Sequence, residues 1–353
     1  MGCNIVVGGQ YGSEGKGKVV ALSAAELKEP WVVRCGGPNS GHTISIYGQD
    51  IVLRQVPAGA GHPGAVLLLS AGCAIDEDIF LAELDWLKVP KERIVVDPRA
   101  VLINATDRAA EQLCVHHIGS TGSGTGAALI RRMSRDAEVK LANKSERLND
   151  RVRLQSVAPL LHEHLGHGGD LIIEGTQGFG LSLLHGGPYP FVTSRDTTAS
   201  AFAMEVGISP RHVNAITLVL RTFPIRVGGN SGPFRNEITW EEVQRLSGAP
   251  VVYPEFTSVT QRLRRVAMFD LNLVKAAVTY NLPTALAVMG LDRFDHKNAG
   301  ASLISDLSAQ SIKFVEWLES ETGIPVDWIG TGFGTGDAIH KSPSKVIKHK
   351  ATL

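Results

Sequence analysis

Short apolar runs alternate with amphipathic stretches along most of the chain. Runs rich in Val, Ile and Leu predict strands at residues 3–7, 31–34, 66–69, 94–96, 171–174, 215–220, 285–289 and 326–329. Apolar residues at helical spacing predict helices at 16–27, 79–87, 107–115, 241–246, 271–279 and 309–322. Because strands and helices alternate, the pattern predicts an α/β fold with a mostly parallel central sheet and flanking helices.

A more polar region interrupts this alternation over about residues 105–165, and it predicts a helical excursion from the sheet. The chain has 353 residues and no recognisable linker or internal repeat, so we expect a single catalytic domain spanning residues 1–353. Lys and Arg total 35, as do Asp and Glu, and this balance disfavours nucleic acid or an anionic membrane as a partner. No apolar run approaches the roughly 20 residues of a membrane span. Four scattered cysteines and the lack of a secretory leader predict a cytoplasmic protein.

The strongest chemical signal is the glycine-rich segment GGQYGSEGKGK at residues 8–18, between the first predicted strand and the first predicted helix. Such a turn directs backbone N–H groups toward phosphates. Gly12 to Lys18 satisfies the G-x-x-x-x-G-K pattern, but Val19 stands where a Walker loop needs Ser or Thr for Mg²⁺. The segment therefore predicts a phosphate-binding loop of another type. The alternative is a glycine-rich turn with two solvated lysines.

Four further segments carry polar groups suited to anions: residues 34–43 (RCGGPNSGHT), 119–126 (GSTGSGTG), 174–194 with EGTQG and YPFVTS, and 258–265 (SVTQRLRR). A histidine among small residues can donate a charge-assisted hydrogen bond to a phosphate, and arginines fit carboxylates with two parallel bonds. Each segment alone could be structural. Together they predict a protein that handles at least two anionic ligands.

These five segments, in this order, resemble the adenylosuccinate synthetase family, whose motifs are GxQxGDEGKGK, GGxNAGHT, GTTG, EGAQG with HGTYPYVTS, and TTGRxRR. The resemblance covers most of the chain. It implies a P-loop-NTPase-like fold and a C–N ligase that works in two steps. The γ-phosphate of a nucleoside triphosphate is transferred to the purine O6, and the amine of aspartate then displaces phosphate at C6.

The resemblance also assigns residues by position. It implies a triphosphate site at Gly12, Ser13, Glu14, Gly15, Lys16, Gly17, Gly41, His42, Thr43, Asp292 and Gly332. It implies a monophosphate site at Asn39, Ser120, Thr121, Arg135, Gln177, Thr193 and Arg262, and an aspartate site at Val259, Thr260, Arg262 and Arg264. The implied catalytic residues are Ser13, Lys16, His42 and Gln177, with Mg²⁺ on Ser13 and the Gly41 carbonyl. The family supplies the arginine that matches Arg135 from the neighbouring subunit, which implies a homodimer.

Two departures from the family pattern bear on substrates. Family members that act on inosine monophosphate have an Asp, which takes the N1 proton, where this chain has Ser13. The phage-type 2-aminoadenylosuccinate synthetases share this Ser and use deoxyguanylate, and a small neutral side chain leaves space for the 2-amino group of guanine. Gly290 replaces the lysine of the family's guanine-reading motif, which favours ATP or dATP over GTP as donor.

The resemblance thus implies a ligase joining L-aspartate to guanosine or deoxyguanosine monophosphate, (d)GMP, for 2-aminoadenine nucleotide synthesis. If a phage encodes the chain, the cytoplasm is that of the host. Two alternatives stay open: an adenylosuccinate synthetase that acts on inosine monophosphate with a relocated base, and an inactive nucleotide-binding protein. The presence of Lys16, His42, Gln177 and Arg262 favours an enzyme, because binding alone does not need that whole set.

Overall fold

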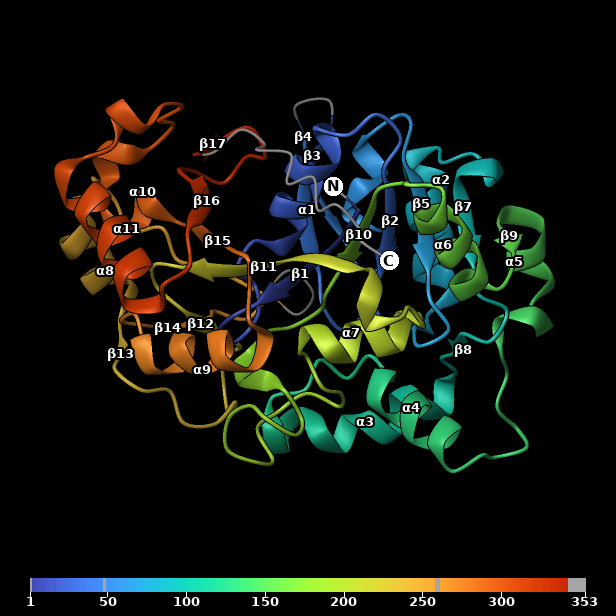
Figure 1. Ribbon diagram of the computed structural model, residues 1–353. Helices are drawn as coiled ribbons and strands as arrows, with labels where there is room; N and C mark the ends of the chain where they lie inside the picture. The colour runs from blue at the N-terminus through green and yellow to red at the C-terminus, as the bar shows by residue number, and fades with distance from the viewer. Residues whose placement is uncertain (1, 47–48, 258–260, 342–353) are drawn as a thin grey trace.

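The computed structural model describes residues 2–46, 49–257 and 261–341, and Figure 1 shows their arrangement. Within these ranges, one central sheet has ten strands in the order β17 (Ala338–His340), β16 (Val326–Gly330), β15 (Ala285–Met289), β11 (Val213–Arg221), β1 (Cys3–Gly8), β10 (Leu171–Glu174), β2 (Trp31–Arg34), β5 (Val66–Leu69), β7 (Ile94–Val96) and β9 (Arg153–Leu154). Neighbouring strands are parallel, except that β17 is antiparallel to β16. The predicted fold class is confirmed.

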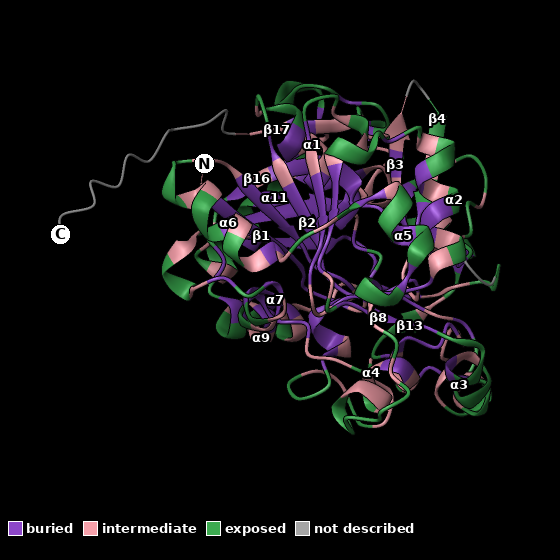
Figure 2. Ribbon diagram, turned by 90° about the vertical axis from the view of Figure 1, so that its right-hand side faces the viewer, coloured by how far each residue is buried: buried purple, intermediate pink, exposed green. Residues whose placement is uncertain are grey.

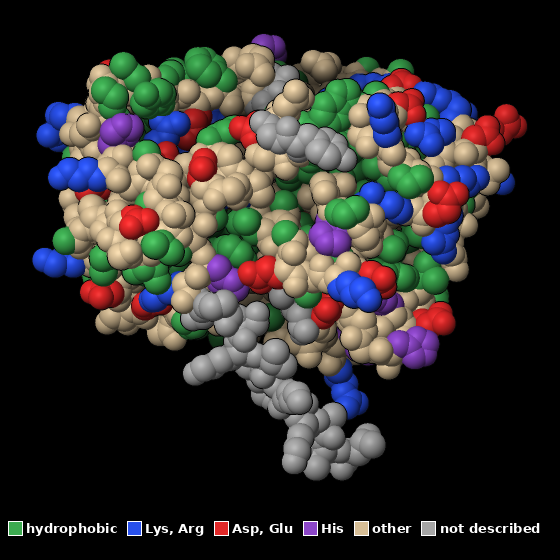
Figure 3. Space-filling model, turned by 90° about the horizontal axis from the view of Figure 1, so that it is seen from above, with side chains coloured by type: hydrophobic (Ala, Val, Ile, Leu, Met, Phe, Trp, Pro, Cys, Tyr) green, Lys and Arg blue, Asp and Glu red, His purple; other side chains and the backbone are tan. Residues whose placement is uncertain are grey.

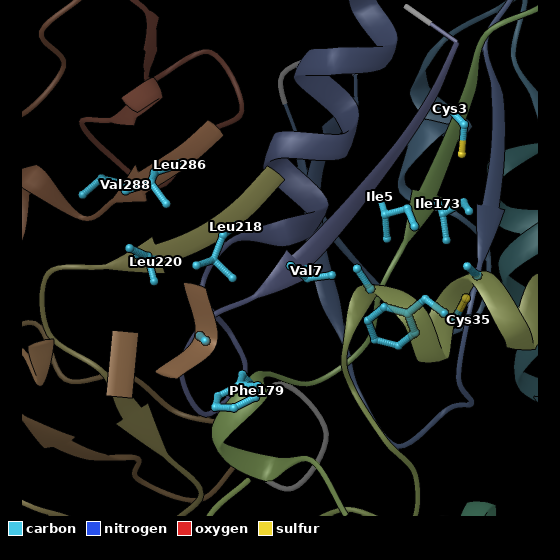
Figure 4. Close-up of a cluster of buried hydrophobic side chains, with 14 of the residues drawn as sticks. Cys3, Ile5, Val7, Cys35, Ile173, Phe179, Leu218, Leu220, Leu286 and Val288 are labelled. Carbon is cyan, nitrogen blue, oxygen red and sulfur yellow. The ribbon is translucent and has the colours of Figure 1, made fainter. Parts of the chain in front are cut away.

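Helices cover both faces of the sheet, because successive side chains of a strand point to opposite sides. In β1, Ile5 and Val7 join one apolar cluster and Val6 joins the other. The first cluster takes apolar residues from α6 (Val157–Gly166), α7 (Ala199–Val206), α9 (Leu271–Asn281) and α11 (Ala309–Thr322). The second takes them from α1 (Lys16–Ala25), α2 (Glu77–Leu87) and α5 (Glu146–Arg151). Figure 4 shows part of the first cluster, with side chains of β1, β10, β11 and β15 beside Cys35 and Phe179.

Two groups of elements lie outside this three-layer arrangement. Helices α3 (Ala105–Ile118) and α4 (Thr125–Met133) lie below the sheet in Figure 1. They adjoin the short strands β6 (Ala74–Ile75) and β8 (Val101–Leu102), with Ala128 of α4 in a small apolar cluster there. A three-stranded sheet of β12 (Ile225–Arg226), β14 (Arg265–Ala267) and β13 (Glu237–Ile238) packs with α8 (Trp240–Ser247), and α8 contacts α10 (Leu291–Phe294). Strands β3 (His42–Ile46) and β4 (Gln49–Leu53) form a separate pair.

The predicted helical excursion over about residues 105–165 is too long. Its last part returns to the sheet, where β9 pairs with β7. Val157 and Leu161 of α6 are fully buried in the first cluster, and Leu148 of α5 is fully buried in the second. The many polar residues of α5 and α6 obscure, in the sequence, the few apolar residues that pack on the sheet. The single domain stays a prediction.

The central strands β1, β2, β5, β7, β10 and β15 are almost entirely buried, and they form the purple centre of Figure 2. Because β1, β2, β10, β11, β15 and β16 run parallel, their carboxyl ends meet at one edge, and the loops that follow them are brought together there. On the face drawn in Figure 3, basic and acidic side chains are interspersed. Within the described part of the chain, none of the helices combines the length and the apolar character needed to span a membrane.

Candidate active site

A cavity of about 810 Å³ opens at the carboxyl edge of the sheet. Most of the residues predicted from the sequence line it together, although they come from segments far apart in the chain. They are Gly12, Ser13, Glu14, Gly15, Lys16, Gly17, Asn39, Gly41, His42, Thr43, Ser120, Thr121, Gln177, Thr193, Arg262, Arg264, Asp292 and Gly332.

Three predicted site residues are not placed on the wall of this cavity. Arg135 is exposed at the end of α4, with a left-handed φ of 58°, and does not line the cavity. Its role in a neighbouring subunit therefore stays a prediction. Val259 and Thr260 lie outside the described residues.

The loop after β1 is held in shape by its own acidic side chain. Glu14 is 1% exposed, and its carboxylate accepts hydrogen bonds from the backbone N–H groups of Gln10 (3.1 Å) and Gly12 (2.8 Å). Lys16 donates to the other oxygen of Glu14 at 2.7 Å and also to the carbonyl of Gln177. A Cβ on Gly15, whose φ is 101°, would lie 2.9 Å from Met289, so glycine is required there. The carboxylate therefore neutralises the charge of this buried lysine.

Lys18, the second lysine of this loop, faces away from Glu14. Its ammonium donates to the carbonyls of Gly332 (3.1 Å) and Asp337 (2.6 Å). Burial lowers the pKa of Lys18 to about 8, although Asp337, Asp292 and Asp50 oppose the shift. The interpretation of two solvated lysines is wrong, because both lysines are buried and bonded.

His42 lies in a buried charged cluster at the start of β3. Its Nε2 donates to the carbonyl of Val56 at 2.9 Å and lies 3.7 Å from Glu174, which is paired with Arg34. A carbonyl can only accept, so Nε2 carries the proton. Burial, and next the charge of Arg34, lower the pKa of His42 to about 4, so the ring is neutral. Its Nδ1 is buried and has no partner among the described residues, which leaves one lone pair for a ligand or a proton.

Ser13 has a φ of 56°, in the left-handed region that few residues other than glycine adopt. Its carbonyl accepts a hydrogen bond from Arg221 at 3.2 Å. Arg221, the last residue of β11, forms two hydrogen bonds with Glu255, and both side chains line the cavity. Burial alone would raise the pKa of Glu255, but Arg221 outweighs it and lowers that pKa. Sequence reasoning missed this pair; the position of Arg221 at the end of a buried strand was the available signal.

The segment at 119–126 is only partly open to an anion. Glu111 of α3 accepts hydrogen bonds from the backbone N–H groups of Gly124 (2.7 Å), Gly126 and Ala127 (3.3 Å), which begin α4. This carboxylate fills the second half of the expected cradle. Ser120 and Thr121 still line the cavity. In this segment, the backbone N–H groups at the start of α4 are thus already bonded, and the hydroxyl groups of Ser120 and Thr121 are the donors that could meet a ligand.

The end of the cavity formed by Arg262 and Arg264 is more open, and we call it the arginine end. Arg262 is exposed, and its backbone N–H donates to the hydroxyl of Thr257 at 2.9 Å. The Nε of Arg264 donates to the carbonyl of Phe256 at 3.1 Å. Arg265 points elsewhere, because both its terminal nitrogens are engaged and it forms an ion pair with Glu237. Only two of the three arginines of the motif face the cavity.

The family profile that matches the chain is that of adenylosuccinate synthetase, over residues 5–153 and 137–299. The adenylosuccinate synthetase of Methanocaldococcus jannaschii is 39% identical over 336 residues, which are 94% of each chain. The enzyme of Thermococcus onnurineus is 40% identical over 336 residues, covering 93% of this chain and 95% of its own.

Two solved structures are similar over nearly the whole chain. The fully ligated adenylosuccinate synthetase of Plasmodium falciparum has a TM-score of 0.85 at 19% identity, covering 96% of this chain and 99% of its own, and it shows the fold. The succinoaminodeoxyadenylate synthetase of cyanophage S-2L, bound to dGMP and to dATP as an energy donor, has a TM-score of 0.81 at 25% identity. That likeness covers 97% of this chain and 96% of the phage protein.

Proposed function

The chain belongs to the adenylosuccinate synthetase family of C–N ligases, and from this premise we propose that it joins L-aspartate to C6 of guanosine or deoxyguanosine monophosphate. The γ-phosphoryl group of a nucleoside triphosphate passes to the guanine O6 as N1 loses its proton. The aspartate amine then attacks C6, and the C6–O6 bond breaks to release phosphate. The amine gives up a proton, and the product is 2-aminoadenylosuccinate or its deoxy form, which keeps the 5′-phosphate of the substrate.

Phosphoryl transfer depends on positioning and on charge neutralisation, and the residues after β1 and β2 suit both tasks. Lys16 is held beside the loop and can exchange Glu14 for a phosphate oxygen. The Nδ1 of His42 becomes a donor once a nearby phosphoryl group favours its protonation, and the Glu174 carboxylate, 3.7 Å from Nε2, stabilises the resulting charge.

The serine at residue 13 is the main observation that supports guanylate as the substrate. The neighbouring carboxylate of Glu14 is occupied by two backbone N–H groups and by Lys16, so it does not replace the family's aspartate. A neutral hydroxymethyl group beside the purine leaves room for a 2-amino group. The cyanophage relative, whose structure holds dGMP and dATP, supports the same substrate and a donor with adenine.

Mg²⁺ is the metal that the family implies, and Ser13 and Gly41 could supply two of its oxygen ligands. Ser13 and Gly41 line the cavity and offer neutral oxygens, while triphosphate oxygens and water supply most of the ligands that Mg²⁺ needs. The bound ion would neutralise charge on the triphosphate. Gly290 in place of a base-contacting lysine favours ATP or dATP over GTP. A homodimer in which Arg135 reaches the neighbouring cavity completes the proposal.

Inosine monophosphate is the second candidate substrate. It is favoured by the identity of 39–40% to archaeal adenylosuccinate synthetases over more than nine-tenths of the chain. This candidate requires a base other than residue 13 for the N1 proton.

An activity panel tests the proposal. Purified protein is incubated with L-aspartate, Mg²⁺, ATP, dATP or GTP, and each of dGMP, GMP, dIMP and IMP, and phosphate release and product mass are measured. We expect aspartate-dependent phosphate release and a succinyl adduct with dGMP or GMP. Turnover of IMP alone supports the second candidate, and no turnover with any nucleotide supports an inactive binding protein.

A further inference from the structure

Phe333 is a large apolar side chain on the cavity wall, and none of the roles predicted from the sequence involves it. It is 69% exposed although it lines the cavity with Gly332 and Asp292. It forms no ring pair with another aromatic side chain in the described ranges. An aromatic ring exposed inside a polar ligand cavity loses hydrophobic stabilisation unless a ligand covers it.

The backbone around Phe333 is fixed on both sides. Lys18 donates to the carbonyls of Gly332 and Asp337, and the Asp337 carboxylate accepts from the N–H of Gly334 at 2.9 Å. Thr335 and Ser45 exchange two hydrogen bonds of 2.8 and 3.0 Å between side chain and backbone, which ties the segment to β3. The ring is therefore presented from a rigid turn.

This turn lies beside the one that carries Gly290 and Asp292. The two follow the neighbouring parallel strands β16 and β15, which lie side by side in Figure 1. A Cβ on Gly330, the last residue of β16, would lie 2.6 Å from the sulfur of Met289, the last residue of β15. Gly290, with a φ of 81°, contributes no side chain, and it lines the same cavity as Asp292 and Phe333.

We propose that Phe333 stacks on the purine base of the nucleoside triphosphate and is the main affinity contact for that base. This inference rests on the proposed function, because it takes the triphosphate to lie along the loop after β1. A ring face recognises any purine, since stacking does not depend on the hydrogen-bonding edge. The absence of a lysine at residue 290 is then compensated by stacking.

The test measures binding without turnover. Dissociation constants for a non-hydrolysable ATP analogue and for inorganic tripolyphosphate, both with Mg²⁺, are determined by calorimetry for the wild type, Phe333→Ala and Phe333→Tyr. Phe256→Ala is the matched control, because Phe256 also lines the cavity and is 51% exposed. We expect Phe333→Ala to weaken the analogue by about 5- to 150-fold, the range found when a stacking aromatic is removed. Tripolyphosphate affinity should not change, Phe333→Tyr should bind normally, and Phe256→Ala should keep the wild-type affinity for the analogue.

The outcomes separate the inference from the proposed function. A wild type that binds the analogue, with Phe333→Ala equally tight, overturns the stacking and leaves the ligase proposal standing. Equal weakening of tripolyphosphate and analogue also overturns it, because the loss would then lie in the phosphate contacts. A wild type that binds no nucleoside triphosphate overturns both.

Discussion

The two ends of the cavity differ in how far they are formed before a ligand arrives. At the end lined by Lys16, His42 and Glu174, all three side chains are at least nine-tenths buried and each already has a bonding partner. At the arginine end, Arg262 is exposed and its described contact is through the backbone. A preformed end suits phosphoryl transfer, which needs fixed charges. An open end suits a small substrate that exchanges with solvent.

The largest expected effect is on the buried end. His42→Ala should lower kcat by about 10²–10³-fold, the usual cost of removing one donor that stabilises transition-state charge. The dissociation constant for (d)GMP should stay within a few-fold of the wild type, because the ring bonds to Val56 and faces Glu174. Steady-state kinetics and calorimetry measure the two quantities. Wild-type turnover would remove His42 from the mechanism.

The next effect concerns the arginine end. Arg264→Leu should raise the KM for aspartate by roughly 10- to 150-fold, since a hydrogen bond to a charged group contributes about 1.5–3 kcal/mol. The KM for the monophosphate should change far less. Arg265→Leu is the matched control, because Arg265 is paired with Glu237 outside the cavity. If the two variants behave alike, the arginine end does not bind aspartate.

A smaller effect is expected from the carboxylate behind His42. Glu174→Gln should lower kcat on the order of ten-fold by loosening the geometry around the imidazole. Glu205→Gln is its control. The side chain of Glu205 is 10% exposed, pairs with Arg195 and accepts a hydrogen bond from the N–H of Gly36 at 2.8 Å, but it does not line the cavity. Both variants should unfold at a lower urea concentration than the wild type, because Arg34 or Arg195 then loses its charged partner. Equal kcat in the two variants would show that Glu174 acts on stability alone.

The smallest effect is a pH dependence of stability at the buried end. The pKa of Lys18 is about 8 in the folded chain and near 10.4 when unfolded, so the unfolded state binds the proton first as pH falls. The free energy of unfolding should therefore decrease by about 1 kcal/mol from pH 9 to pH 8 through this residue. Urea titrations of Lys18→Met should lack this contribution, whereas the exposed Lys275→Met should keep it. A slope shared by all three proteins would refute the assignment.

The sequence predicts the buried strands and the motif residues of the cavity more accurately than it predicts the helix boundaries. The strands at 31–34, 66–69 and 171–174 were predicted to the residue, because a strand buried on both faces is an unbroken apolar run. Helix α4 lies within the expected helical excursion, but its start was not predicted, because its first residues, Thr125 and Gly126, belong to a glycine-rich segment typical of loops. The cavity residues predicted from motifs were largely assembled in one place.

Contacts between distant segments left no trace in the sequence. Arg221 and Glu255 pair across 34 residues, and Glu111 reaches the start of α4 from another helix. Neither Glu255 nor Glu111 belongs to a recognisable motif. Each meets its partner only because the folded chain brings the two segments together. The role of Lys18 was likewise hidden, because it depends on carbonyls more than 300 residues away.

The proposed selection of guanylate by Ser13 is tested by replacing this residue. Asp and Asn both tolerate the left-handed backbone found at this position, so Ser13→Asp and Ser13→Asn should fold alike and differ only in the carboxylate. The measurement is kcat/KM for dGMP and IMP in the wild type and both variants. We expect the wild type to prefer dGMP and Ser13→Asp to raise activity on IMP at least ten-fold, within the roughly 10²–10⁴-fold that a general base contributes. Ser13→Asn should give no such gain. A wild type that prefers IMP, or an equal gain in both variants, would show that Ser13 does not select guanylate.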